Sequence, residues 1–193
     1  WEAIFCAVRI QDGDVVQAWR EHDALLSEKC EILNKYQFAE LHYENEAGTD
    51  FRVGLVKNHI WEGGSEESGS GVRFIANMPT EEVFTMPDYR KAEGKVVSSR
   101  PLSYRGNLIK DFSLTFHEGK VVDFDAREGY DALKQLLDTD EGSKSLGEVA
   151  LVPYASPISE MGILFYNTLF DENASCHLSL IHISEPTRRR GIS

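Results

Sequence analysis

The chain has 193 residues, of which 41% are hydrophobic and 27% charged, and its net charge at neutral pH is −12. This length suffices for one large domain, or for one domain and part of another. The acidity argues against a nucleic-acid or anionic-membrane surface, and no apolar run approaches the roughly 18 residues that a membrane span needs.

The cysteines and the first residues bear on cellular location. Cys6, Cys30 and Cys176 are odd in number and show no Cys-x-x-Cys spacing. Free thiols in a reducing compartment explain them most simply, so a cytoplasmic protein is expected. The chain opens on WEAIF, without an initiator Met or a signal-peptide pattern, and is expected to come from within an open reading frame.

Residues 14–36 are expected to form an amphipathic helix. Trp19, Leu26, Cys30 and Leu33 are spaced seven, four and three residues apart, which places them along one stripe. An Asp-Gly-Asp turn just before them supplies an N-cap. The stripe is interpreted as core packing and carries no chemistry.

The following segments alternate between extended, turn-like and helical patterns. A glycine-rich stretch at 63–71 is interpreted as a solvated loop, because it matches no phosphate-binding motif. Mixed strands and helices with hairpins predict an α/β architecture, with α+β as the alternative, built on a mixed β-sheet with flanking helices. The expected strands are 38–43, 51–56, 72–76, 112–116, 121–124 and 147–152, and a second helix is expected at 130–137.

Three glutamates and one histidine are candidates for chemistry. Glu82 follows a strand-to-turn break, Glu148 opens an apolar strand, and Glu172 and His177 lie close together near the end. On one continuous helix, residues five apart point roughly 140° apart. Glu172 and His177 are therefore expected to converge only if Glu172 precedes a first helical turn that contains His177.

Residue types alone leave other interpretations open. Most glutamates are solvated, and a single histidine near an apolar segment is more often a packing residue than a ligand. No HExxH or GxSxG motif is present, which disfavours a helix-borne zinc protease site and a Ser/His/Asp hydrolase. A glycosidase with two carboxylates would explain the acidic residues but not His177.

Three long motifs, in order, carry a family resemblance. Residues 77–85 read NMPTEEVFT, residues 147–153 read GEVALVP, and residues 164–177 read LFYNTLFDENASCH. With their spacing, these segments resemble the aminopeptidase T and aminopeptidase S family of two-metal aminopeptidases. The resemblance covers residues 1–177.

The resemblance implies a metal centre and a reaction. Glu82, Glu148, Glu172 and His177 are the implied metal ligands, with Glu81 as the fallback for its neighbour, and Glu148 is also the implied catalytic residue. Two divalent ions, zinc or cobalt in the family, would activate water to release N-terminal amino acids from peptides that have free N-termini. Family members are homodimers, so the full-length protein is expected to be one.

The chain also departs from the family at both ends. Family chains are about twice as long, and after the third motif they carry a tyrosine, a histidine and an aspartate that do not follow His177 here. We therefore expect residues 1–64 to be the end of an N-terminal part, 65–177 an incomplete catalytic domain, and 178–193 a non-native tail similar to a translated sequencing adapter. The parent protein is expected to be active and this fragment inactive. The alternative is a non-catalytic module that retains the peptidase scaffold.

Overall fold

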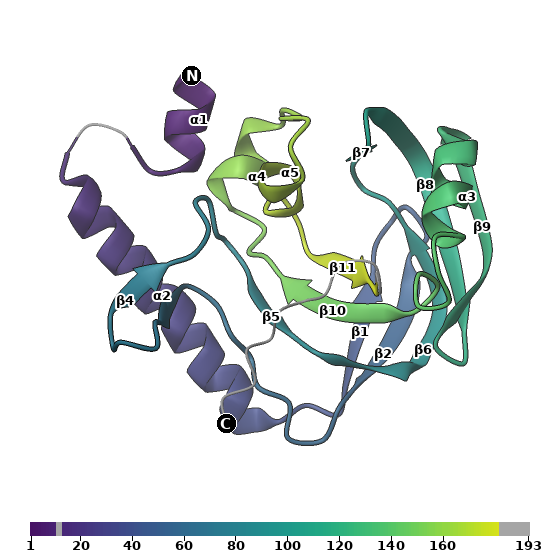
Figure 1. Ribbon diagram of the computed structural model, residues 1–193, viewed down its shortest axis with the longest axis horizontal. Helices are drawn as coiled ribbons and strands as arrows, with labels where there is room; N and C mark the ends of the chain where they lie inside the picture. The colour runs from purple at the N-terminus through teal and green to yellow at the C-terminus, as the bar shows by residue number, and fades with distance from the viewer. Residues whose placement is uncertain (11–12, 182–193) are drawn as a thin grey trace.

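The computed structural model describes residues 1–10 and 13–181, in which helices flank antiparallel sheets (Figure 1). The helices are α1 (Glu2–Ala7), α2 (Val15–Tyr36), α3 (Tyr130–Leu137), α4 (Pro157–Met161) and α5 (Thr168–Glu172). The strands are β1 (Glu40–Glu44), β2 (Asp50–Leu55), β3 (Ser65–Glu67), β4 (Arg73–Ile75), β5 (Val83–Thr85), β6 (Pro87–Val97), β7 (Leu102–Tyr104), β8 (Asn107–His117), β9 (Lys120–Glu128), β10 (Leu146–Leu151) and β11 (His177–Leu180). Among these helices, none is long and apolar enough to cross a membrane.

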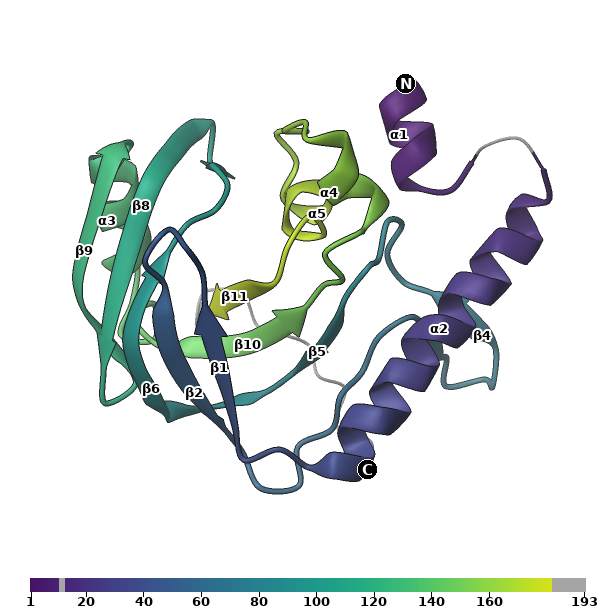
Figure 2. The same cartoon turned by 180° about the vertical axis from the view of Figure 1, so that it is seen from behind.

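Two sheets organise the molecule. The larger sheet has the order β1-β2-β6-β8-β7, with β9 also paired to β8, and the smaller sheet has the order β11-β10-β5. Figures 1 and 2 show the smaller sheet between α2 and the outer strands β8 and β9. The predicted combination of helices and sheet is confirmed, and every pairing within the described residues is antiparallel.

Helix α2 forms as its sequence predicts. The Asp14 side chain caps its first turn by accepting a hydrogen bond from the Gln17 N–H at 3.0 Å, which satisfies a donor that has no partner inside the helix. Three residues of the predicted stripe are buried, and the fourth, Leu33, packs against the same core. His22 also lies buried on this stripe, although the pattern of apolar residues did not single it out.

One hydrophobic core joins α2, both sheets and α3. It contains Leu26 from α2, Phe51 and Phe116 from the larger sheet with ring centroids 5.1 Å apart, and Val149 from β10. Residues on both sides of the expected boundary at residue 64 contribute to it. The strand that carries Glu148 is therefore anchored in the same core as helix α2.

Several strands were not predicted, and the sequence shows why. The segment expected to be a loop at 63–71 contains β3, which pairs with β4 in an exposed hairpin. Strand β6 was not expected because its many charged residues hide any simple alternation. It pairs with β2 on one side and with β8 on the other. Gly94 allows the close crossing: its φ is +102°, and a Cβ there would lie 2.2 Å from the Asp50 carbonyl oxygen.

Strand β11 continues past the boundary expected at residue 177. Leu178 and Leu180 pack against the core, and the Ile181 N–H donates to the Ser145 carbonyl at 2.8 Å. The first residues after His177 are therefore part of the sheet, although the tail was expected to begin at residue 178. The remainder of the expected tail lies outside the described residues.

Two truncations test this role of β11. Deleting residues 178–193 is expected to lower the free energy of unfolding by at least about 2 kcal/mol, because two partly buried leucines and the β10 pairing are lost. Deleting residues 182–193 removes none of these contacts and serves as the control. Equal denaturant midpoints for the two shortened chains would contradict a structural role for residues 178–181.

Candidate metal centre

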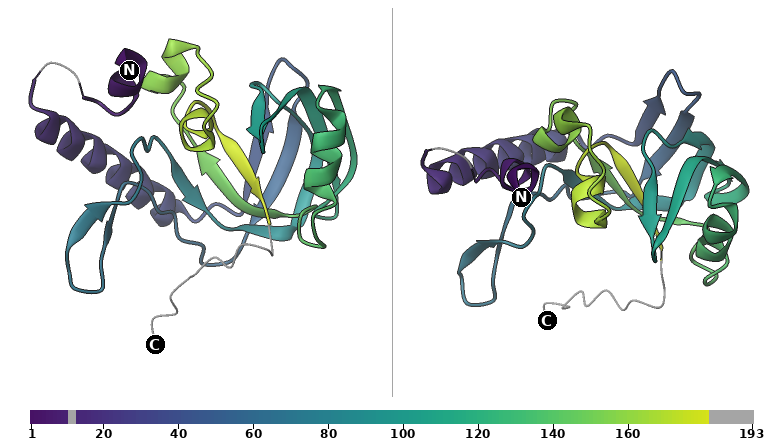
Figure 3. Two further views of the ribbon diagram at one scale, coloured as in Figure 1. Left: turned by 45° about the horizontal axis from the view of Figure 1, so that its top comes forward. Right: turned by 90° about the horizontal axis from the view of Figure 1, so that it is seen from above.

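Four chain segments meet at one face of the smaller sheet. Glu82 immediately precedes β5, Glu148 lies within β10, and His177 is the first residue of β11. Glu172 is the last residue of α5, which lies beside the start of β11 (Figure 3). Residues 95 positions apart in the chain are thus brought together by strand pairing.

The strand register places the three sheet residues on the same face. Ala150 pairs with His177 on one side and with Phe84 on the other. Because side chains alternate along a strand, Glu148 shares the face of Ala150, and Glu82 shares the face of Phe84. Glu82, Glu148 and His177 therefore face the same side of the sheet.

A β-bulge in β10 reconciles this face with the core. Leu146 pairs with Leu180, whereas Glu148 pairs with Ser179, so two residues of β10 oppose one residue of β11. The extra residue lets Leu146 and Val149, three positions apart, both enter the core while Glu148 points away from it. Bulges at such positions redirect side chains next to functional sites.

Three of the four predicted ligands are within coordination distance of one another. Glu82, Glu172 and His177 each offer one atom, and these atoms all lie within 4.8 Å of each other. Nε2 of His177 is 2.8 Å from Oε2 of Glu82. Zinc bonds of roughly 2.0–2.2 Å to oxygen and nitrogen place neighbouring ligand atoms at comparable separations.

The hydrogen bonds of His177 show that this group fits a cation. Its Nδ1 lies 3.2 Å from the Ser175 carbonyl oxygen, and its Nε2 faces Oε2 of Glu82. Oε2 of Glu82 is buried, and no other group among the described residues donates a hydrogen bond to it. A proton or a metal ion can bridge Nε2 and this oxygen, and a backbone carbonyl beside the far ring nitrogen is typical of metal-ligating histidines.

The pKa values in the group show strong electrostatic coupling. Burial alone would lower the pKa of His177, but the carboxylates of Glu82 and Glu172 and the Ser175 carbonyl raise it above its ordinary value. Burial raises the pKa of Glu172, and the negative charges of Glu82 and Glu148 raise it further, against the effect of His177. Glu148 is thus electrostatically part of the same group, and the surplus of negative charge favours a cation.

Glu81, the fallback ligand, lies elsewhere. Glu81 is only 2% exposed. Its carboxylate forms a bidentate ion pair with the partly buried guanidinium of Arg9, in which Nη2 is 2.8 Å from Oε2. Nε2 of His22 lies 3.8 Å from the same oxygen. The structure therefore places Glu82, and not Glu81, beside Glu172 and His177.

The expected helical arrangement of the last two candidates is wrong. Glu172 ends α5 instead of preceding it, and His177 starts a strand. Asp171 accepts two backbone N–H groups from the loop before α5, and Asn173 is the residue just after that helix. The two side chains converge because the chain turns between a helix end and a strand start, a change of direction that helical spacing cannot describe.

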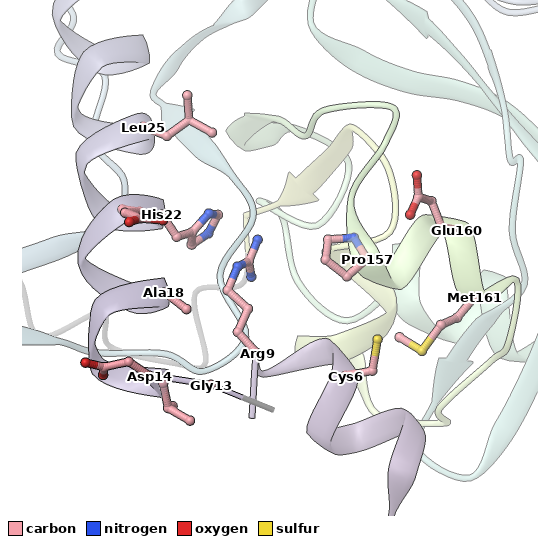
Figure 4. Close-up of a pocket in the computed structure, with 12 residues that line it drawn as sticks. Cys6, Arg9, Gly13, Asp14, Ala18, His22, Leu25, Pro157, Glu160 and Met161 are labelled. Carbon is pink, nitrogen blue, oxygen red and sulfur yellow. The ribbon is translucent and has the colours of Figure 1, made fainter. Parts of the chain in front are cut away.

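A hollow of about 760 Å³ lies between α1, α2 and α4, and none of the four candidate ligands lines it. Arg9 and His22 project into it, opposite Pro157 and Met161 (Figure 4). Arg9 binds the Glu81 carboxylate and His22 binds the Thr80 carbonyl, so the hollow borders the segment before β5 but not the candidate ligands. Sequence reasoning missed both residues: His22 was detectable from the α2 stripe, and Arg9 had no local signal.

Comparison with known proteins identifies the family. Residues 1–185 match the family model described as thermophilic metalloprotease (M29). This chain belongs to that family. The resemblance inferred from the three motifs is thereby confirmed.

Relatives of known name extend the comparison. The chain is 55% identical over 180 residues to aminopeptidase AmpS of Bacillus subtilis and 54% identical over 180 residues to aminopeptidase 2 of Geobacillus stearothermophilus. Each alignment covers 93% of this chain but only 44% and 43%, respectively, of the relative. The solved structure of wild-type AmpT from Thermus thermophilus superposes with a TM-score of 0.86 at 44% identity, over 93% of this chain and 44% of that one. The M29 chain described here thus spans less than half the length of these relatives.

The raised pKa of His177 makes metal affinity dependent on pH. Metal and proton compete for Nε2, so Co²⁺ affinity is expected to rise with pH until His177 has lost its proton, at a pH above the ordinary histidine value of roughly 6.5. Below that point each pH unit weakens binding about tenfold. Calorimetric titration with Co²⁺ at several pH values measures the slope.

The stability of the metal-free chain should change with pH in the opposite direction to its Co²⁺ affinity. A raised folded-state pKa means that His177 contributes stability fully below its unfolded pKa, and this contribution is lost as pH rises through the folded value. The control is His117→Gln, at an exposed histidine outside both groups of possible metal ligands among the described residues, which should leave the pH dependence of Co²⁺ affinity unchanged. A Co²⁺ affinity independent of pH would place His177 outside the site.

Proposed function

We propose that this chain is part of the catalytic domain of a metal-dependent aminopeptidase that releases N-terminal amino acids from peptides. The observation that carries the proposal is the convergence of His177 with the carboxylates of Glu82 and Glu172 in a partly buried acidic group, where Nε2 of His177 lies 2.8 Å from Oε2 of Glu82. Membership of a metalloprotease family and relatives named as aminopeptidases support the same reaction.

The proposed ligands are Glu82, Glu148, Glu172 and His177. Carboxylate and imidazole ligands suit zinc and cobalt, and carboxylates can be shared between two ions, so we propose two divalent ions. Such ions, when bound, would polarise the scissile carbonyl and lower the pKa of a water molecule. The proposed substrates are peptides with free N-termini, because a surplus of carboxylates attracts the positive α-ammonium group.

Glu148 is the residue to which we assign a catalytic role. Strand β10 pairs with β5 and with β11, so the backbone that carries Glu148 is fixed on both sides. Its charge acts on Glu172 across the site. A carboxylate held this rigidly can keep a substrate atom or water in one position, which is a major source of catalytic rate.

Other features of the whole protein are also proposals. The relatives are more than twice as long as the aligned region, so further ligands and a homodimer contact are proposed to lie in segments corresponding to the rest of their length. A cytoplasmic location is proposed from the three free cysteines. The sequence from residue 182 onward is proposed to be non-native and similar to a translated sequencing adapter, which the encoding DNA can decide.

The test is to express the entire reading frame that encodes this chain and to measure the peptidase activity of the resulting protein. Activity should disappear with a chelator and return with Zn²⁺ or Co²⁺. Glu148→Gln should lower kcat/KM at least about 100-fold, because it removes a charge from the metal cluster while keeping the shape. Glu66→Gln, on the exposed hairpin, is the matched control and should be silent.

Two outcomes would contradict the proposal in different ways. Full activity without metal, or unchanged turnover in Glu148→Gln, would rule out the mechanism. Tight metal binding with no release of amino acids from any peptide would favour the alternative, a module that keeps the scaffold without catalysis.

A further inference from the structure

The residues around Glu81 form a network that reaches two of the proposed ligands. Asn173 is completely buried, and its side chain has two arms. Oδ1 accepts a hydrogen bond from the Glu81 backbone N–H at 2.6 Å, and Nδ2 donates to the Leu169 carbonyl at 2.8 Å. One amide group therefore connects the segment before β5 with helix α5.

The two hydrogen bonds join the two chain segments that carry Glu82 and Glu172. Glu81 is the residue before Glu82, and Asn173 itself follows Glu172. The amide thus sets the separation between two backbone segments that each present a carboxylate to the same group. No other hydrogen bond given for the described residues joins residues 80–82 directly to residues 168–173.

The segment before β5 is also held from the side of α2. Nε2–H of His22 donates to the Thr80 carbonyl at 2.6 Å, and burial lowers the pKa of His22. Arg9 binds the Glu81 carboxylate. These contacts hold Thr80 and Glu81 in place. Loss of the Asn173 hydrogen bond to this segment is therefore expected to shift the position of Glu82.

We propose that Asn173 is a positioning residue for the metal centre, holding the segment of Glu82 and the helix end of Glu172 at the separation that metal binding needs. The inference rests on the proposed function, since it gives Asn173 a role only if these carboxylates bind metal. Residues that orient metal ligands in this indirect way typically change affinity 10- to 100-fold when removed.

The test separates positioning from general stability. Asn173→Ala removes both arms, and Asn173→Asp keeps the size and an acceptor oxygen for the Glu81 N–H. The matched control is Ser156→Ala, which removes a buried hydrogen bond at 3.1 Å to the carbonyl of the same Asn173 but leaves both amide arms intact. Co²⁺ affinity and the visible Co²⁺ spectrum are measured on the full 193-residue chain, together with thermal melting of the metal-free chain.

Asn173→Ala is expected to weaken Co²⁺ binding about 10- to 100-fold and to alter the spectrum. Asn173→Asp should recover only part of the affinity, because it keeps the arm to Glu81 but turns the donor to the Leu169 carbonyl into an acceptor. Ser156→Ala should lower the melting temperature but keep the affinity within about twofold of the unaltered chain. If Asn173→Ala fails to fold, Asn173→Ser, whose side chain is too short for both arms, is expected to show the same loss of affinity.

The contrary results are distinct. Unaltered affinity in Asn173→Ala or Asn173→Ser, or an equal loss in Ser156→Ala, would overturn the positioning role alone. Absence of Co²⁺ binding by the unaltered chain would overturn the proposed metal centre and the positioning role with it.

Discussion

The antiparallel pairing of β10 with β5 and β11 is the constraint on which the candidate site depends. Two of the proposed ligands sit at the edges of very short strands, and neither strand would hold its position alone. Pairing through Ala150 fixes both neighbours, so that Glu82 and His177 approach within hydrogen-bonding distance. The core face of the same strand, anchored by Val149, keeps β10 from rotating.

Adjacent glutamates before β5 show how neighbouring residues of one type can have unrelated roles. Glu81 is neutralised by Arg9, and Glu82 faces His177. The sequence offers two identical side chains and no local difference between them. The distinction arises from the direction of alternation in an extended segment, and the pairing of β5 determines that direction.

Sequence alone predicted both of the longer helices, parts of six strands and the identity of the clustered side chains. Helix α2 was correct because it has a long apolar period and a cap, and the shorter helix α3 was correct at its expected bounds. The three motifs identified Glu82, Glu172 and His177, which the structure brings together. Strands β3, β5, β7 and β11 escaped because segments of three or four residues rarely display a period, and β6 escaped because its charged residues hide any alternation.

The arrangement around the site escaped for a different reason. His177 was expected in a helix because spacing was the only available guide, whereas its strand is created by pairing with β10. Arg9 and Asn173 act on residues distant in the chain, through contacts that no local pattern reports. What a sequence conceals here is long-range hydrogen bonding.

The β-bulge in β10 couples the register of this strand to the packing of the core. Without the extra residue, a one-step slip of β10 would send the Glu148 carboxylate into the core and expose Val149 to the acidic group. Both changes are unfavourable, since one buries a charge and the other removes an apolar side chain from its packing. Correct packing of the core therefore requires the same strand register that brings the candidate ligands together. Other registers are less stable even when no metal ion is bound.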